Sequence, residues 1–399
     1  MSRPLRVLHC PANVGGNPQG LARAERELGL QSWAVTFRQR TFQYPVDEVL
    51  WPKTCGRLGR EWRRWKLLRR ALRDFDVVHF NFGCSIGPER LSFDHSRMRA
   101  ERLPTKWLYT AYSALFDLRD LAWLKRAGIG IVMTYQGDDA RQGDFCREKF
   151  EISIADEVGP DYYTAGSDRN TRRRIQRVAR YADRIYALNP DLLHVLPAGS
   201  EFLPYASVDC REWTPIGASA DPARPPVVLH APTHREAKGT RYILDAVEKL
   251  RKVDRIDFEF MLVENLSHAK ARRLYEQADL LVDQLLAGWY GALSVELMAL
   301  GKPVVCYIRR DDLKLIPAGM RAELPIITAE PQTVYHVLKQ WLGQRRTGLA
   351  EVGQRSRTFV EKWHDPLTIS ERLKQAYEDI AGGQRRRTRQ RPANTLARN

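Results

Sequence analysis

Two loops, each followed by a helix, hold the side chains with the clearest potential for chemistry. Arg235 and Lys238 lie in the first loop, and two cations at a helix N-terminus can hold a diphosphate and stabilise it as it leaves. Gly291 and Ala292 open the second helix, where free N–H groups attract an anion. Glu296 follows as the single carboxylate of an apolar run, and its two oxygens can accept hydrogen bonds from two sugar hydroxyls.

These side chains are positioned by a strand–helix–strand unit. Residues 280–282 are expected to form a buried strand, residues 288–291 a glycine loop, and residues from 292 a helix; a break at 301–303 precedes a second strand from 304. Ligands of such units collect at the carboxyl ends of the strands. Two alternatives are an ordinary buried α/β unit with one satisfied glutamate and a solvated charged loop at 235–238.

The stretch 278–308 resembles the donor-binding motif of glycosyltransferase family 4, whose members have the GT-B fold, use nucleotide sugars and retain configuration. In that family two glutamates eight residues apart bracket a glycine loop, and the helix continues as Glu-x-Met-Ala-x-Gly-x-Pro-Val. Gly291 fits the loop glycine, and Gly288 stands where the family has its first glutamate, which usually touches the transferred sugar. The remaining motif positions are matched by Glu296, Met298, Ala299, Gly301, Pro303 and Val304.

A second departure from the family follows the expected strand at 130–135. Residues 136–141 resemble the family's His-Gly-x-Asp-x-Arg, with Gln136 in place of the histidine beside the transferred sugar. Glutamine keeps hydrogen bonding but cannot act as a general base. Asp139 or Asp283 is expected to supply a replacement carboxylate to the sugar, and Gly288 is counted among the sugar-facing positions.

The resemblance assigns three further parts of a donor site. Gly15 and Gly16 follow the first predicted strand and would face the donor diphosphate, although the pair alone is a weak signal. Lys238 fits the family's lysine, whereas its arginine is replaced at the expected position and Arg235 is the nearest substitute. Asn265 ends a predicted strand and is expected near the nucleotide base.

Composition points to an ordinary globular protein with two domains. The chain has 399 residues, of which 43% are hydrophobic and 28% charged. Its six scattered cysteines suggest neither a disulfide framework nor a metal site, and the N-terminus is expected to form a first strand in place of a signal peptide. A cytoplasmic location is expected, with a peripheral position at the inner face of the membrane left open.

The net charge of +16 calls for an acidic partner, which can be nucleic acid, anionic lipid or a phosphorylated substrate. Residues 57–73 combine eight Lys/Arg with leucines and tryptophans at helical spacing, a composition typical of an anionic membrane surface. The alternative is a sheet-covering helix with a solvated basic face. Nucleic acid is not the expected partner.

The predicted fold class is α/β, with two Rossmann-like domains of the GT-B type that face each other across a cleft. The expected segments are an N-terminal acceptor-side domain at 1–204, a linker at 205–226, a donor domain at 227–365, a helix at 366–381 that packs back on the first domain, and a disordered basic tail at 382–399.

The resemblance implies a hexosyltransferase that moves a sugar from a nucleotide diphosphate to a glycan or lipid-linked acceptor with retention, in cell-envelope polysaccharide synthesis. No cofactor beyond the nucleotide sugar is expected, and no metal, because Lys238, Arg235 and the helix after Gly291 would replace it. Two alternatives stay open: a nucleotide-sugar epimerase of the same fold and a non-catalytic lipid- or polyanion-binding protein.

Overall fold

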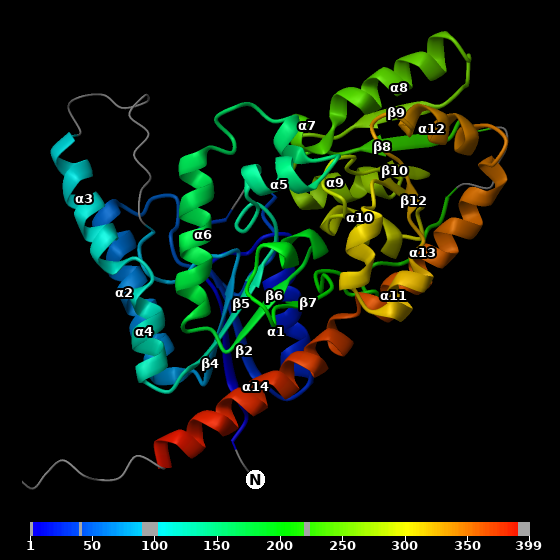
Figure 1. Ribbon diagram of the computed structural model, residues 1–399. Helices are drawn as coiled ribbons and strands as arrows, with labels where there is room; N and C mark the ends of the chain where they lie inside the picture. The colour runs from blue at the N-terminus through cyan, green and yellow to red at the C-terminus, as the bar shows by residue number, and fades with distance from the viewer. Residues whose placement is uncertain (1–2, 40–41, 90–102, 219–223, 390–399) are drawn as a thin grey trace, which may run out of the picture.

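The computed structural model describes residues 3–39, 42–89, 103–218 and 224–389, and it contains two parallel β-sheets with helices packed on their faces (Figure 1). The strands of the first sheet lie within residues 6–202, and the second sheet comes from residues after 226. The predicted α/β architecture with two Rossmann-like domains is therefore confirmed.

Parallel pairing dominates both sheets, as expected where helices connect consecutive strands. Within the described residues the first sheet has seven strands, in the spatial order β3 (Glu48–Val49), β2 (Gln31–Thr36), β1 (Arg6–Cys10), β4 (Val77–Asn81), β5 (Gly130–Tyr135), β6 (Arg184–Ala187) and β7 (Glu201–Phe202). The second sheet, counted over the same residues, has five: β12 (Ile327–Thr328), β11 (Val304–Cys306), β10 (Leu280–Val282), β8 (Val227–His230) and β9 (Glu259–Leu262).

The helices cover the faces of the two sheets. Those of the first domain are α1 (Asn17–Glu27), α2 (Arg57–Asp74), α3 (Leu103–Phe116), α4 (Arg119–Arg126), α5 (Gly143–Lys149) and α6 (Ala165–Ala179). Those of the second domain are α7 (Arg235–Lys238), α8 (Thr240–Lys252), α9 (His268–Tyr275), α10 (Ala292–Ala299), α11 (Ala318–Glu323), α12 (Val334–Leu342) and α13 (Leu349–Trp363), and α14 (Pro366–Arg389) ends the described chain. Short 3₁₀ helices are η3 (Ile154–Asp156), η4 (Pro190–His194), η5 (Arg310–Leu315) and η6 (Arg346–Gly348). Across the described ranges, none of the helices is long and apolar enough to cross a membrane.

Side chains of the first sheet alternate between two hydrophobic cores. Val7 and Val77 face the core that contains side chains of α1 and α14, whereas Leu8 and Val78 face the core formed with α2 and α4. Because successive residues of a strand point to opposite faces, strands buried on both sides appear in the sequence as continuous apolar runs. The core next to α1 continues through Trp289 into the second domain, so the two domains share apolar packing.

The last helix, α14, returns from the second domain and packs against α1 of the first (Figure 1). The hydroxyl of Tyr377 donates to buried Glu25 over 3.0 Å and lies 2.7 Å from Nδ1 of His79. α14 runs on through Arg389, into the stretch predicted to lack structure from residue 382, because glutamine and arginine are good helix formers. Residues 390–399 of that predicted tail lie outside the described residues, and the proposed domain and linker bounds stay predictions.

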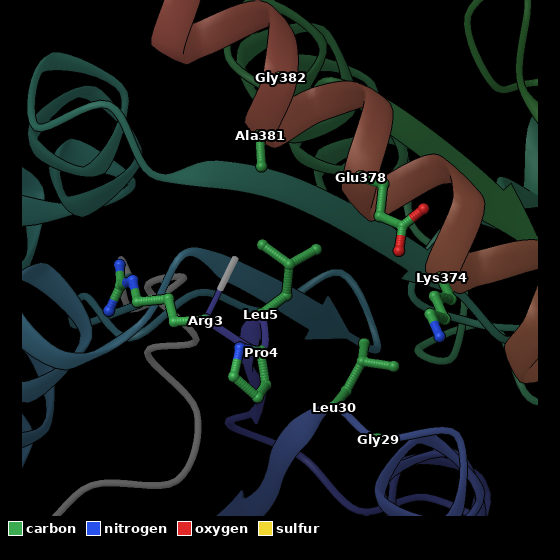
Figure 2. A pocket seen from close by; sticks show the side chains of 9 residues that line it. All are labelled: Arg3, Pro4, Leu5, Gly29, Leu30, Lys374, Glu378, Ala381 and Gly382. Atoms are coloured by element: carbon green, nitrogen blue, oxygen red, sulfur yellow. The ribbon is translucent and has the colours of Figure 1, made fainter. Parts of the chain in front are cut away.

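A cavity of 410 Å³ lies between α14 and the start of β1 (Figure 2). Lys374 and Glu378 reach it from α14, and Arg3 reaches it from the segment before β1. Leu5 directly precedes β1, so the cavity lies at the amino ends of the strands. Ligands of open parallel sheets bind at the carboxyl ends, on the opposite side from this cavity.

Candidate functional site

A second cavity, of 440 Å³, lies between the two sheets at the carboxyl ends of their strands. Its wall combines loops that follow β1, β2 and β4 with loops that follow β8 and β10. Both domains therefore contribute to one site, at the edge where doubly wound folds bind their ligands. Residues of the wall with relevant chemistry are Gly15, Arg38, Thr233, Lys238, Gly291 and Glu296.

The glycine loop of the first domain meets the start of α10 across this cavity. Gly15 has φ of +60°, and a Cβ atom added to it would lie 3.3 Å from the Cβ of Ala292. α10 begins at Ala292, directly after Gly291, so the first N–H groups of the helix have no acceptor within it. Gly16, with φ of +72°, lies against the ring of Tyr44. The structure thus brings the predicted Gly15, Gly291 and Ala292 together.

Lys238 ends α7 and directs its ammonium group toward the loop after β10. Its Nζ donates to Asp283 Oδ1 and to Gln284 Oε1, each over 2.8 Å. Asp283 is 1% exposed and also accepts hydrogen bonds from the Gly291 N–H and the Ser294 hydroxyl. Burial raises the pKa of Asp283, but the charge of Lys238 and these hydrogen bonds outweigh burial and hold the pKa below its usual value. Asp283, predicted to contact the sugar, instead lies behind Lys238 and fixes the start of α10.

Glu296 lies one turn further along α10 and is only 2% exposed. Its Oε1 accepts a hydrogen bond from the Tyr44 hydroxyl over 3.2 Å and lies 2.9 Å from Nε2 of His268. Burial and the neighbouring carboxylate raise the pKa of Tyr44, so its hydroxyl stays a donor. Because Tyr44 belongs to the first domain, this contact bridges the cleft. Tyr44 and Glu296 line both the 440 Å³ cavity and a neighbouring cavity of 190 Å³.

Arg235 and Asn265 lie outside the wall of the cavity. Arg235 is largely exposed, and its guanidinium group donates twice to the carboxylate of Glu264. Asn265 is exposed and takes a left-handed backbone conformation with φ of +56° in the loop after β9. Arg38 of the first domain lines the cavity together with Lys238, so the positive charge of the wall comes from both domains.

Gln136 and Asp139 follow β5, but neither lines the 440 Å³ cavity. The carboxylate of Asp139 accepts hydrogen bonds from the backbone N–H groups of Gln136, over 3.0 Å, and Gly137, over 2.6 Å. Asp139 therefore holds the turn after the strand. The Gln136 side chain is nine-tenths buried, and its Nε2 has no hydrogen-bond partner within the described part of the chain.

Gly288 lies beneath Arg309 and lines neither the 440 Å³ cavity nor the 190 Å³ cavity. Its φ of +78° favours glycine, and a Cβ atom here would lie 2.5 Å from Nη1 of Arg309. Arg309 donates to the carbonyl of Ile152 in the first domain over 3.0 Å and stacks on the ring of Phe150. The sequence predicts a sugar contact at position 288, whereas the structure fills that space with an arginine that ties the domains together.

Several residues that complete the cavity carry no motif and were missed by the sequence prediction. Arg38 and Tyr44 come from the loop after β2 and Tyr275 comes from α9, whereas His268 of α9 lines the neighbouring 190 Å³ cavity. The basic and aromatic residues that follow β2 are a signal that could have pointed to Arg38 and Tyr44, because the loop after a parallel strand opens at the carboxyl edge of the sheet. No comparable signal marks the two residues of α9.

No family model and no curated protein matches the sequence. Among solved structures, sucrose-phosphate synthase from Thermosynechococcus elongatus aligns with a TM-score of 0.55 at 15% identity, over 96% of this chain and 100% of that one. HepE of Anabaena in complex with UDP-glucose aligns with a TM-score of 0.55 at 13% identity, over 94% of this chain and 99% of that one. An α-glucosyltransferase in complex with UDP-glucose and DNA containing an abasic site aligns with a TM-score of 0.54 at 11% identity, over 94% of this chain and 99% of that one. The likeness shows the fold: the chain has the two-domain GT-B architecture found in these glycosyltransferases.

Proposed function

We propose that the protein is a glycosyltransferase that takes a hexose from a nucleotide diphosphate and passes it, with retention of configuration, to a glycan or lipid-linked acceptor. One observation carries the proposal: the 440 Å³ cavity gathers a glycine loop, a helix N-terminus, two basic side chains and a buried carboxylate at the carboxyl edges of two parallel sheets. A role in cell-envelope polysaccharide synthesis belongs to the same proposal.

We assign the donor diphosphate to the space between Gly15, Lys238 and the first turn of α10. Glycine at position 15 lets the backbone approach the phosphates, and the helix N-terminus and Lys238 supply positive charge. Glu296 follows Ala292 by four residues, about 6 Å along the helix axis. That spacing suits a ribose that follows the diphosphate, with its two hydroxyls donating to the carboxylate.

The chemistry of this arrangement is stabilisation of a leaving group. As the bond between sugar and diphosphate breaks, negative charge grows on the phosphate oxygen, and Lys238, Arg38 and the dipole of α10 lie where they can stabilise it. We assign this charge stabilisation to the protein's own cations and to no metal. Retention follows if the acceptor attacks from the face that the diphosphate leaves, with the departing phosphate oxygen taking the acceptor's proton.

Incubation with a panel of nucleotide sugars tests the proposed activity. A transferase is expected to release free sugar slowly from its preferred donor, and the first-formed anomer, read by NMR, is expected to keep the configuration of the donor. An isomerised nucleotide sugar would support the epimerase instead. If the protein binds nucleotides but carries out neither reaction with any donor of the panel, the non-catalytic binding protein is the correct alternative.

Glu296→Gln is expected to weaken binding of nucleoside and nucleoside diphosphate about tenfold, because an amide offers one acceptor where the carboxylate offers two. Tyr44→Phe is the matched control, since it removes the hydrogen bond between Tyr44 and Glu296 and leaves both carboxylate oxygens in place. Because the ribose would take the place of that hydroxyl, Tyr44→Phe should bind as well as the wild type or better. Calorimetry measures both; equal losses in the two variants would show that Glu296 acts only by closing the cleft.

A further inference from the structure

The outward surface of α3 is apolar over residues 107–116. Trp107 is 64% exposed, Leu108 73% and Leu115 52%. Ala111 and Ala114, also exposed, complete the stripe, which contains no charged residue. Large side chains exposed side by side on a soluble domain mark a surface that another body covers, because scattered single residues are normal but contiguous apolar patches are not.

α2 lies beside α3 (Figure 1), and its exposed side chains include several that are basic. The hydroxyl of Tyr112 on α3 donates to Glu61 of α2 and accepts from the indole N–H of Trp65, each over 2.8 Å, which fixes the two helices side by side. The exposed stripe of α2 next to this contact contains Leu58, Trp62, Lys66, Arg69 and Arg73.

The inner face of α2 covers the sheet, so only part of its charge is available to a partner. Leu67 and Leu68 are buried in the core, and Arg64 donates to the carbonyls of Ile86 and Gly87. The exposed basic side chains of α2 take no part in these contacts and are therefore available to a partner. α2 is thus a sheet-covering helix, as one of the two interpretations of residues 57–73 has it, whose opposite face is still unexplained.

We propose that the outward face formed by α2 and α3, the α2–α3 surface, docks on an anionic phospholipid bilayer. The apolar stripe of α3, with Trp62 of α2, would enter the interface between headgroups and acyl chains, while Lys66, Arg69 and Arg73 lie against lipid phosphates. We infer a bilayer as the partner because this surface places exposed leucines next to cations. Nucleic acid offers phosphates and base faces but no use for exposed leucines, and a second copy of this surface would set like charges against each other.

Sedimentation with vesicles tests the α2–α3 surface without any need for a donor or for catalysis. The wild type is expected to bind vesicles containing phosphatidylglycerol, and to bind less at high salt. The charge variant Lys66→Glu, Arg69→Glu and Arg73→Glu should bind at least about 100-fold more weakly, from about fivefold for each basic residue at such a surface. The matched control reverses three exposed basic residues of the second domain, Lys270, Arg321 and Arg355, and should bind as the wild type does.

A second variant tests the apolar half of the surface. Trp62→Ala, Leu108→Ala and Leu115→Ala remove exposed side chains, so the fold is expected to survive while vesicle binding falls and its salt dependence remains. Several results would overturn the proposal: equal binding to vesicles of phosphatidylcholine alone, full binding by this apolar variant, or loss of binding when residues 383–399 are deleted while the charge variant binds normally. Tighter binding to short duplex DNA than to vesicles, or a dimer that the apolar variant abolishes, would replace the bilayer with nucleic acid or a second copy.

Discussion

Lys238→Met is expected to lower the affinity for a nucleoside diphosphate about 10- to 100-fold and also to destabilise the fold. The loss of affinity follows from a charge-assisted contact to phosphate. The loss of stability follows because Asp283, 1% exposed, keeps its carboxylate but loses its cation. Breaking a buried pair from one side costs about 3 kcal/mol. Calorimetry with a nucleoside diphosphate and denaturant unfolding measure the two effects separately.

The pH dependence of Lys238→Met separates the stability effect from a general packing defect. In the wild type the depressed pKa of Asp283 means that the ion pair stabilises the fold above the unfolded pKa of about 4, and that this stabilisation is lost as the pH falls through the folded pKa. Without Lys238, burial raises the pKa of Asp283. The difference in unfolding free energy between wild type and variant should therefore be large at neutral pH and shrink in acid.

A double variant distinguishes the two roles of Lys238. Adding Asp283→Asn to Lys238→Met removes the uncompensated carboxylate, so stability should recover in part while nucleotide affinity stays low. Lys270→Met, which changes an exposed lysine of α9, is the control and should alter neither quantity. If Lys238→Met keeps full nucleotide affinity, the 440 Å³ cavity is not the donor site.

Gly288→Ala is expected to lower the free energy of unfolding by about 3 kcal/mol. The residue has φ of +78°, and the new Cβ would lie 2.5 Å from Nη1 and 3.0 Å from Cβ of Arg309. Arg309 cannot easily move away, because it donates to Ile152 and to Asp312 and its guanidinium carbon lies 3.6 Å from the ring centroid of Phe150. Urea unfolding followed by circular dichroism measures the change.

Two comparisons separate backbone strain from the collision with Arg309. Gly29 has a similar φ of +85°, and a Cβ atom added to it would have nothing within 4 Å. Gly29→Ala should therefore lower the free energy of unfolding only by the energy of the left-handed conformation, about 1 kcal/mol. In an Arg309→Ala background only the 3.0 Å contact with the Cβ of residue 309 remains, so the cost of Gly288→Ala should fall most of the way to that value. An equal loss in all three contexts would show that Arg309 adjusts freely, and that glutamate at position 288 could be accommodated as in the resembling family.

Local pattern in the sequence was enough to predict the elements that carry the site. The strand at 280–282 and the helix that begins at Ala292 lie where the apolar runs and the glycine loop predict them. So does the strand Gly130–Tyr135. These features are decided within a few residues of chain, by side-chain periodicity and by where glycine interrupts it. The same local pattern brought Gly15, Lys238, Gly291, Ala292 and Glu296 to attention, and the structure gathers these five at one cavity.

What the sequence could not decide is which loops meet across the cleft. Tyr44 and Glu296 are 252 positions apart, and nothing near either residue encodes their hydrogen bond. For the same reason Arg38, and not Arg235, reaches the cavity with Lys238, and Arg309 occupies the space over Gly288. The sequence by itself determined the parallel α/β units and the loop chemistry at their carboxyl ends. The tertiary structure alone decided which of those side chains face the cavity, because that depends on how two separately built sheets pack against each other through a shared core.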